Sequence, residues 1–89
     1  MNLDRWTTFT KSQQLLMIGS EIMRAQVWQG KDDEKFRGAI ERGLTLADLT
    51  LRDPKWAEDA PMIEGLRDEM GKFLNHERTD DIQILYAAL

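Results

Sequence analysis

Helix start and stop signals divide this chain into segments of helical length. Thr10 and Gln13 have the spacing of a capping box, in which the two side chains satisfy backbone N–H groups at a helix start. Gly30 suits the left-handed residue that ends a helix, Asp32 can cap the next one, and Asp53-Pro54 stops one helix and caps another. Between these signals the predicted elements are helices over about residues 11–29, 34–52 and 61–75, with a short turn through Trp56.

The two ends of the chain carry weaker signals. Residues 1–9 have no clear period and are expected to be irregular or to form one short turn. Thr79 can cap a last helix, although residues 82–86 also suit a short strand; since the chain offers no second strand for pairing, we expect a helix. The chain is therefore predicted to be all-α, a small bundle of about four helices in a single domain spanning residues 1–89.

The composition indicates a folded chain with a small core. Of its 89 residues, 42% are hydrophobic and 31% are charged, which is typical of globular proteins rather than disordered ones. A chain of this length buries a smaller share of its surface than a larger domain does. Because it contains no cysteine, neither disulfides nor thiolate metal sites can compensate. Tight packing or oligomerisation is expected to do so.

Charge and hydropathy bear on location and partners. The net charge of -4 disfavours nucleic acid, because affinity for phosphate depends on clustered Lys and Arg. The same charge disfavours anionic membranes. No apolar run approaches the length that spans a bilayer, and the amino terminus lacks the pattern of a secretory signal. We therefore expect a cytoplasmic protein that binds neither nucleic acid nor membranes.

The helix predicted over residues 11–29 has an unusually broad apolar surface. Its arc comprises Leu15, Leu16, Ile18, Gly19, Ile22, Met23, Ala25 and Val27, and the remaining face carries Met17, Glu21, Arg24 and Trp28. A helix that is apolar nearly all round is buried from several sides, which so short a chain can scarcely provide alone. We therefore predict a homodimer with Met17, Arg24 and Trp28 at its interface. The alternative is burial of these side chains under the N-terminal arm or the Asp53-Pro54 turn.

The helix predicted over residues 34–52 is expected to lie centrally beside the first. Its core arc is formed by Phe36, Ala39, Ile40, Gly43, Leu44, Leu46, Ala47 and Leu51. On its other side Arg37 lies four residues before Glu41, a spacing that allows an ion pair on a helix surface. The same spacing relates Asp48 to Arg52. We expect a solvated ladder of charges along this side.

Five glycines fall inside the predicted helices. Each costs about 0.5–1 kcal/mol relative to alanine unless something compensates. Gly19 and Gly43 lie on the apolar arcs of adjacent helices, where we expect them to allow close approach. Gly38, Gly65 and Gly71 are expected to mark local weakness.

No residue pattern predicts catalysis or a cofactor. The only histidine, His76, lies near a predicted helix end, where stabilising the helix dipole is its expected role. The His, Cys and Glu-x-x-His patterns of zinc and di-iron sites are missing, so no metal site is predicted. The remaining enzymatic alternative is a small Mg²⁺-dependent nucleotide pyrophosphohydrolase, an all-α enzyme that uses paired acids. Against it, Glu64, Asp68 and Glu69 face away from the apolar stripe of their helix.

Four segments in the middle of the chain together form a distinctive pattern. They are Gly19-Ser-Glu-Ile-Met-Arg24 continuing to Trp28, Phe36-Arg-Gly-Ala-Ile-Glu-Arg42, Leu46-Ala-Asp-Leu-Thr50 and Asp53-Pro-Lys-Trp56. The pattern resembles a group of small, uncharacterised prokaryotic all-helical proteins. This resemblance implies a helical fold and carries no assigned activity. It places the following residues among the signature positions of that group: Glu21, Arg24, Trp28, Glu41, Arg42, Asp48, Asp53 and Trp56.

The charged signature positions suggest a polar network across the two central helices. Its predicted members are Glu21, Arg24, Glu41 and Asp48. Within it, Arg24 is expected to pair with Glu21 or to reach a carboxylate on the next helix. The leading hypothesis is a non-enzymatic protein–protein interaction module that self-associates. Docking of a second, different protein on the same face stays open as an alternative.

Overall fold

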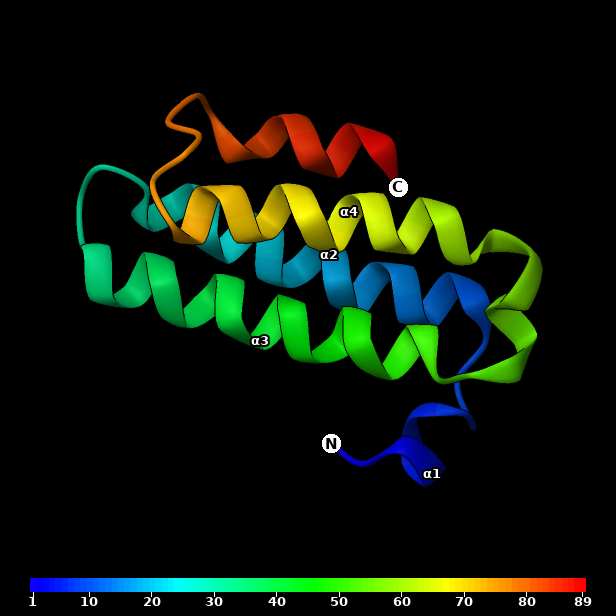
Figure 1. Ribbon diagram of the computed structural model, residues 1–89. Helices are drawn as coiled ribbons and strands as arrows, with labels where there is room; N and C mark the ends of the chain where they lie inside the picture. The colour runs from blue at the N-terminus through cyan, green and yellow to red at the C-terminus, as the bar shows by residue number, and fades with distance from the viewer.

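Four helical elements follow one another in alternating directions along the length of the molecule (Figure 1). The computed structural model describes residues 1–89, of which 78% are helical and none form strands. In chain order the elements are α1 (Leu3–Trp6), α2 (Lys11–Trp28), α3 (Asp33–Leu51), the 3₁₀-helix η1 (Pro54–Asp59), α4 (Ala60–Leu74) and the 3₁₀-helix η2 (Ile82–Ala88). The prediction of an all-α bundle of about four helices is confirmed, with α2, α3, α4 and η2 as its members.

The predicted signals at both ends of α2 are present in the structure. The Gln13 N–H donates to the Thr10 hydroxyl at 3.1 Å, and the Thr10 N–H donates to the Gln13 amide oxygen at 2.9 Å. Gly30 has a φ of 74°, the left-handed conformation that glycine adopts without strain. The Lys31 N–H closes this turn on the Trp28 carbonyl at 2.9 Å. The helix therefore begins and ends where its local sequence predicts.

Aspartates precede each of the next three elements, and two of them act as caps. The Asp32 carboxylate accepts a backbone N–H at 3.1 Å at the start of α3. The Asp53 carboxylate accepts the Lys55 N–H at 3.1 Å at the start of η1. Asp59 precedes α4 without a capping bond, and its carboxylate pairs with the Lys11 ammonium at 2.8 Å.

The end of α4 is closed by a Schellman motif centred on His76. The Glu77 N–H donates to the Lys72 carbonyl at 2.9 Å, and the His76 N–H donates to the Phe73 carbonyl at 3.3 Å. His76 has a φ of 59°, a conformation in which glycine is the usual residue. The imidazole lies at the end of the helix, as predicted, with Nε2 3.9 Å from the Asp33 carboxylate.

The last segment is helical, but its geometry and its cap differ from the prediction. It is a 3₁₀-helix that begins at Ile82, and Asp81 rather than Thr79 caps it, with a carboxylate oxygen 2.9 Å from the backbone N–H two residues later. Gln29 at the end of α2 holds this start. Its amide donates to the Asp80 carbonyl at 2.7 Å and accepts from the Ile82 N–H at 2.8 Å. η2 thereby packs along α2 and α4.

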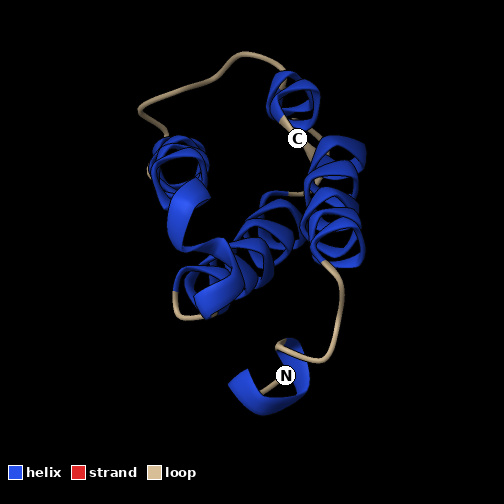
Figure 2. Cartoon of the chain, turned by 90° about the vertical axis from the view of Figure 1, so that its right-hand side faces the viewer, coloured by secondary structure: helices blue, strands red, loops and turns tan.

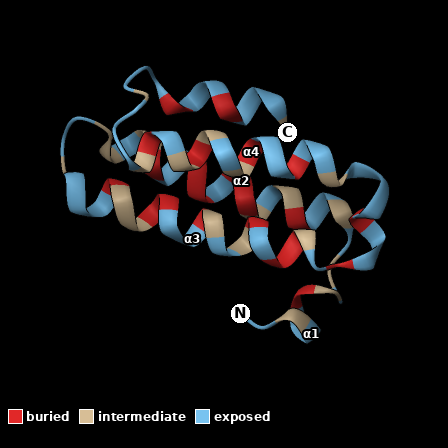
Figure 3. Ribbon diagram, in the orientation of Figure 1, coloured by how far each residue is buried: buried red, intermediate tan, exposed pale blue.

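The core lies between α2, α3 and α4 and is completed by residues of α1, η1 and η2 (Figure 2 and Figure 3). Its buried hydrophobic residues are Trp6, Ile18, Ile22, Ala25, Phe36, Ala39, Ile40, Ala47, Leu49, Trp56, Ile63, Leu66, Met70, Phe73, Ile82 and Leu85. Each of the six helical elements contributes at least one of these core residues. A chain of this size therefore uses even its short terminal elements to cover its core.

Two glycines allow close packing, as predicted. A Cβ at Gly43 would lie 3.2 Å from the Met70 sulfur and 3.6 Å from the Glu21 Cβ, so α3 is close to both α4 and α2 there. A Cβ at Gly19 would lie 2.9 Å from the Tyr86 ring. Gly19 thus allows close approach of η2 rather than of α3.

Candidate functional site

α2 divides into a buried inner face and an exposed outer face. Its buried residues are Gln14, Ile18, Gly19, Glu21, Ile22 and Ala25. Leu16, Met23 and Val27 also belong to the predicted apolar arc, yet they are 64%, 37% and 49% exposed. The chain by itself therefore covers only part of that arc. Glu21, predicted for the other side of the helix, is instead 7% exposed within the inner face.

The outer face of α2 is apolar or uncharged along most of its length. We define it as Ser12, Leu16, Ser20, Met23 and Val27, all of which are exposed. Successive members are three or four residues apart along the helix, which keeps them on one side. At one end η2 extends this surface, where Tyr86 and Leu89 border a shallow hollow of about 300 Å³ beside Leu16.

The three residues predicted for an interface have different surroundings. Met17 and Trp28 are half-buried and pack against the core. The Lys35 ammonium lies 4.1 Å from the centre of the Trp28 ring, close enough for a cation–π contact. The Arg24 side chain is 62% exposed and follows Met23 of the outer face. Arg24 is thus the one member of the set that is mainly open to solvent.

The Glu21 carboxylate is the centre of a charged cluster between α2 and α3. One of its oxygens accepts from Arg24 Nη1 at 2.5 Å, and the other accepts from Arg42 Nε at 2.9 Å. The predicted pairing of Arg24 with Glu21 is therefore confirmed. The partner from α3 is Arg42, however. Neither Glu41 nor Asp48 joins the cluster, and Asp48 pairs with Arg67 of α4 instead.

An open groove of about 940 Å³ runs beside this cluster. It is lined by Arg24, Trp28, Asp32, Asp33, Glu34, Lys35, Arg37, Gly38, Glu41 and Arg42. Four of these side chains are basic and four are acidic, so the groove has both signs of charge. Trp28 is its one hydrophobic residue. Such a surface suits small polar groups better than apolar ligands.

Arg37 and Asp48 of α3 bind to α4 rather than to Glu41 and Arg52 of their own helix. The Arg37 guanidinium donates to the Leu74 carbonyl at 2.8 Å. The Asp48 carboxylate pairs with Arg67 at 3.4 Å. The predicted ladder of ion pairs within α3 is therefore wrong at both steps, because an adjacent helix offers partners for the same side chains.

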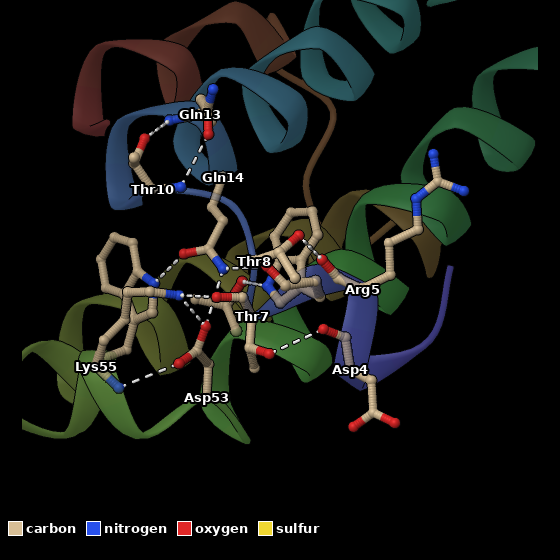
Figure 4. A network of polar contacts seen from close by, with 12 residues as sticks. Asp4, Arg5, Thr7, Thr8, Thr10, Gln13, Gln14, Asp53 and Lys55 are labelled. Atoms are coloured by element: carbon tan, nitrogen blue, oxygen red, sulfur yellow. Dashed lines mark hydrogen bonds and ion pairs between the residues drawn. The ribbon is translucent and has the colours of Figure 1, made fainter.

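A buried hydrogen-bond network joins α1, α2, α3 and η1 around Gln14 (Figure 4). The Gln14 amide nitrogen donates to the Trp6 carbonyl and to the Asp53 carboxylate, each at 2.9 Å. Its amide oxygen accepts from the Trp56 indole at 2.6 Å. The Trp6 indole in turn donates to the Thr50 hydroxyl at 3.1 Å. All five side chains are buried, so this network holds the N-terminal arm and η1 to one end of the bundle.

Asp53 is the ionisable member of the network. Burial raises the pKa of its carboxyl group, but hydrogen bonds from Lys55 and Gln14 together lower it by more than burial raises it. The resulting pKa lies below the usual 3.8. The Lys55 ammonium also donates to the Thr7 carbonyl at 3.2 Å. The sequence predicts Asp53 as a cap alone. Gln14 and Thr50 carry no sequence signal for this role, since such residues are ordinarily exposed on helices.

The acids considered for a Mg²⁺ enzyme do not meet in the structure. No three of the His, Asp and Glu residues form a cluster that could hold a metal ion. Glu64 and Asp68 are exposed on α4, and Glu69 pairs with Lys72 at 3.0 Å and with Arg78 at 2.8 Å.

None of the helices combines the length and the apolar character needed to cross a lipid bilayer.

The fold and these surfaces define an all-α helical bundle with an exposed apolar helix face and a charged groove beside it. Comparisons of the chain with protein-family models, with curated proteins and with solved structures find no match. The resemblance to small prokaryotic helical proteins stays a prediction. Inferences about function therefore depend on the surfaces themselves.

Proposed function

We propose that this protein is a non-enzymatic interaction module that self-associates through the outer face of α2. The observation that carries the proposal is the exposure of Leu16, Met23 and Val27 on one side of a well-formed helix. Removing contiguous apolar surface from water favours association, and such patches are typical of protein–protein interfaces. Arg24 lies at the edge of this surface, which keeps it within the predicted interface.

The chemistry of the outer face favours a second copy of the chain as the partner. In a two-fold symmetric dimer the same patch meets itself, so a patch with a net charge would repel its copy. Leu16, Ser20, Met23 and Val27 carry no charge. Ser20, near the middle of the face, is small enough to let two helices approach closely. The short length of the face predicts a modest interface and a reversible dimer.

Sedimentation velocity over low-micromolar to near-millimolar concentrations tests the proposal. We expect the wild-type protein to shift from monomer to dimer as concentration rises. Met23→Glu places a charge in the centre of the outer face and is expected to leave only monomer. The matched control is Met62→Glu on α4, where the methionine is 44% exposed compared with 37% for Met23; it should dimerise as the wild type does.

Two results would contradict self-association. One is a wild-type protein that remains monomeric at the highest concentration, which would favour docking of a different protein on the same face. The other is a Met23→Glu variant that dimerises with unchanged affinity, which would place the interface elsewhere. Added salt should strengthen the dimer slightly, because each copy has a net charge of -4 and screening reduces their repulsion.

A further inference from the structure

Arg24 and Arg42 have hydrogen-bonding capacity that the protein leaves unused. Each donates one bond to Glu21, and the structure gives neither guanidinium another partner. A guanidinium has five N–H donors in one plane, so most donors on each remain free. The two side chains are 62% and 58% exposed, and both line the open groove between α2 and α3. A ligand in the groove can therefore reach them.

Both guanidinium groups are held in position by the carboxylate of Glu21. The Glu21 side chain is only 9% exposed, and it bonds the two arginines through different oxygens. Gly38 lies one turn before Arg42, and Arg42 Nη1 is 3.5 Å from the position that a Cβ at Gly38 would occupy. The Arg42 side chain can thus lie back over the α3 backbone. A donor pair arranged before binding loses less conformational freedom when a ligand arrives.

Charge selects the class of ligand. Glu21 neutralises one of the two arginines, which leaves one positive charge at the cluster. The groove lining as a whole has four basic and four acidic side chains, and its four acids, Asp32, Asp33, Glu34 and Glu41, oppose a ligand with several negative charges. Planar guanidinium groups match the geometry of a carboxylate, which can accept two parallel hydrogen bonds. The local charge and the donor geometry both favour one carboxylate group.

We infer that this groove binds a single carboxylate group, which accepts hydrogen bonds from the free donors of Arg24 and Arg42. The site borders the outer face of α2 at Arg24, but its donors and its groove belong to one copy of the chain, so binding does not depend on self-association. The carboxylate can belong to a small organic acid or to a Glu or Asp side chain of a polypeptide. Both sources present the same chemistry to the two arginines.

NMR titration of the ¹⁵N-labelled protein tests this site. Acetate is added at constant ionic strength against chloride, while the Arg42 Nε–H and Trp28 indole resonances are followed. We expect saturable shifts of both resonances in the wild type. In Arg42→Met, where Arg24 still pairs with Glu21 and the fold is retained, the Trp28 indole resonance is followed and its saturable shift is expected to be lost. The control is Arg67→Met, which removes an arginine of α4 outside the groove and should bind acetate as the wild type does.

Glu21→Gln separates a binding role from a purely structural ion pair. Glutamine keeps one oxygen that can accept from one of the two arginines and removes the neutralising charge, so acetate affinity should rise several-fold. A structural pair without a ligand predicts no saturable binding in either protein. A neutral peptide with one Glu that binds more tightly than acetate would identify a polypeptide as the source, and equal affinity would identify a small acid. Non-saturating shifts, or tighter binding of inorganic phosphate than of acetate, would overturn the inference.

Discussion

Each face of α2 includes side chains that depart from the usual pattern of apolar residues inside and polar residues outside. The inner face buries Gln14 and Glu21, and no buried side-chain nitrogen or oxygen in the protein lacks a hydrogen-bond partner. The outer face leaves Leu16, Met23 and Val27 in contact with solvent. Burial on this helix therefore depends on which neighbouring element supplies a partner. Polar groups are tolerated inside where their bonds are made, and apolar groups stay outside where no element packs on them.

The largest expected effect contrasts two aliphatic side chains on these faces. Ile18→Ala removes a fully buried side chain between the helices and is expected to lower the free energy of unfolding by about 3–4 kcal/mol. Leu16→Ala removes a largely exposed one and should change it by less than about 0.5 kcal/mol. Urea unfolding of both variants at low protein concentration, followed by tryptophan fluorescence, measures the difference. Equal losses would show that the outer face is buried in the folded monomer.

The polar part of the inner face is tested by Gln14→Met. Methionine has a similar volume but leaves the Trp56 indole without a partner and removes one hydrogen bond each from the Asp53 carboxylate and the Trp6 carbonyl, which keeps its bond from the Phe9 N–H. We expect a loss of about 3 kcal/mol in unfolding free energy. Gln26→Met, on the same helix and without a side-chain hydrogen bond, is the control and should be nearly neutral. A Gln14 variant as stable as this control would mean that the network contributes little.

Removing both arginines of the Glu21 cluster is expected to lower the free energy of unfolding more than removing Glu21 does. A double Arg24→Met, Arg42→Met variant leaves a buried carboxylate unpaired and should cost about 2 kcal/mol. Glu21→Leu should cost less than about 1 kcal/mol, because both arginines are more than half exposed and water can solvate them. Urea unfolding at neutral pH compares the variants. If the Glu21 variant were the less stable one, the arginines would be less accessible than the structure indicates.

The smallest effect concerns pH and the Asp53 end of the inner face. Because the folded state lowers the pKa of Asp53 below 3.8, its ionised form stabilises the protein above about pH 4, and this contribution is lost as pH falls through the folded-state pKa. Asp53→Asn should therefore show a shallower decrease in unfolding free energy between pH 5 and about pH 2. Urea unfolding across this range measures the slope.

Other carboxylates provide the comparison for that slope. Hydrogen bonds from Lys72 lower the pKa of Glu69, and those from Arg78 lower the pKa of Asp80. Both groups lie far from Gln14 in the sequence and are exposed to a greater extent than Asp53. They should leave part of the acid dependence in the Asp53→Asn variant. An unchanged slope in that variant would show that Asp53 does not contribute to stability through its ionisation.

Much of the fold could be predicted because its boundaries are set by local interactions. The Thr10 and Gln13 side chains cap backbone groups within three residues, and Gly30 adopts a left-handed turn that needs no distant partner. Asp53-Pro54 likewise acts within its own turn. The last segment is different, because Asp81 and not the predicted Thr79 caps it. Its conformation depends on Gln29, which is distant in sequence.

The candidate sites were predicted only where their contacts are local. Arg24 and Glu21 are three residues apart on one helix, and their predicted pairing is present. The choice between Glu41 and Arg42 on α3 could not be made from spacing, because adjacent residues on a helix point about 100° apart and the rotation of α3 is set by packing. Spacing alone likewise could not show that Asp48, predicted for this network, pairs with Arg67 of α4 instead.

The sequence by itself determined the three long helices, their ends and the breadth of the apolar arc on α2, since these follow from backbone bonding and periodicity over a few residues. Only the tertiary structure decided which part of that arc is covered, and that Gln14 becomes the centre of a buried network. The physical reason is that burial and long-range hydrogen bonds are properties of pairs of elements. The Gln14–Asp53 bond joins residues separated by 39 positions, and it forms only after the bundle has brought them together.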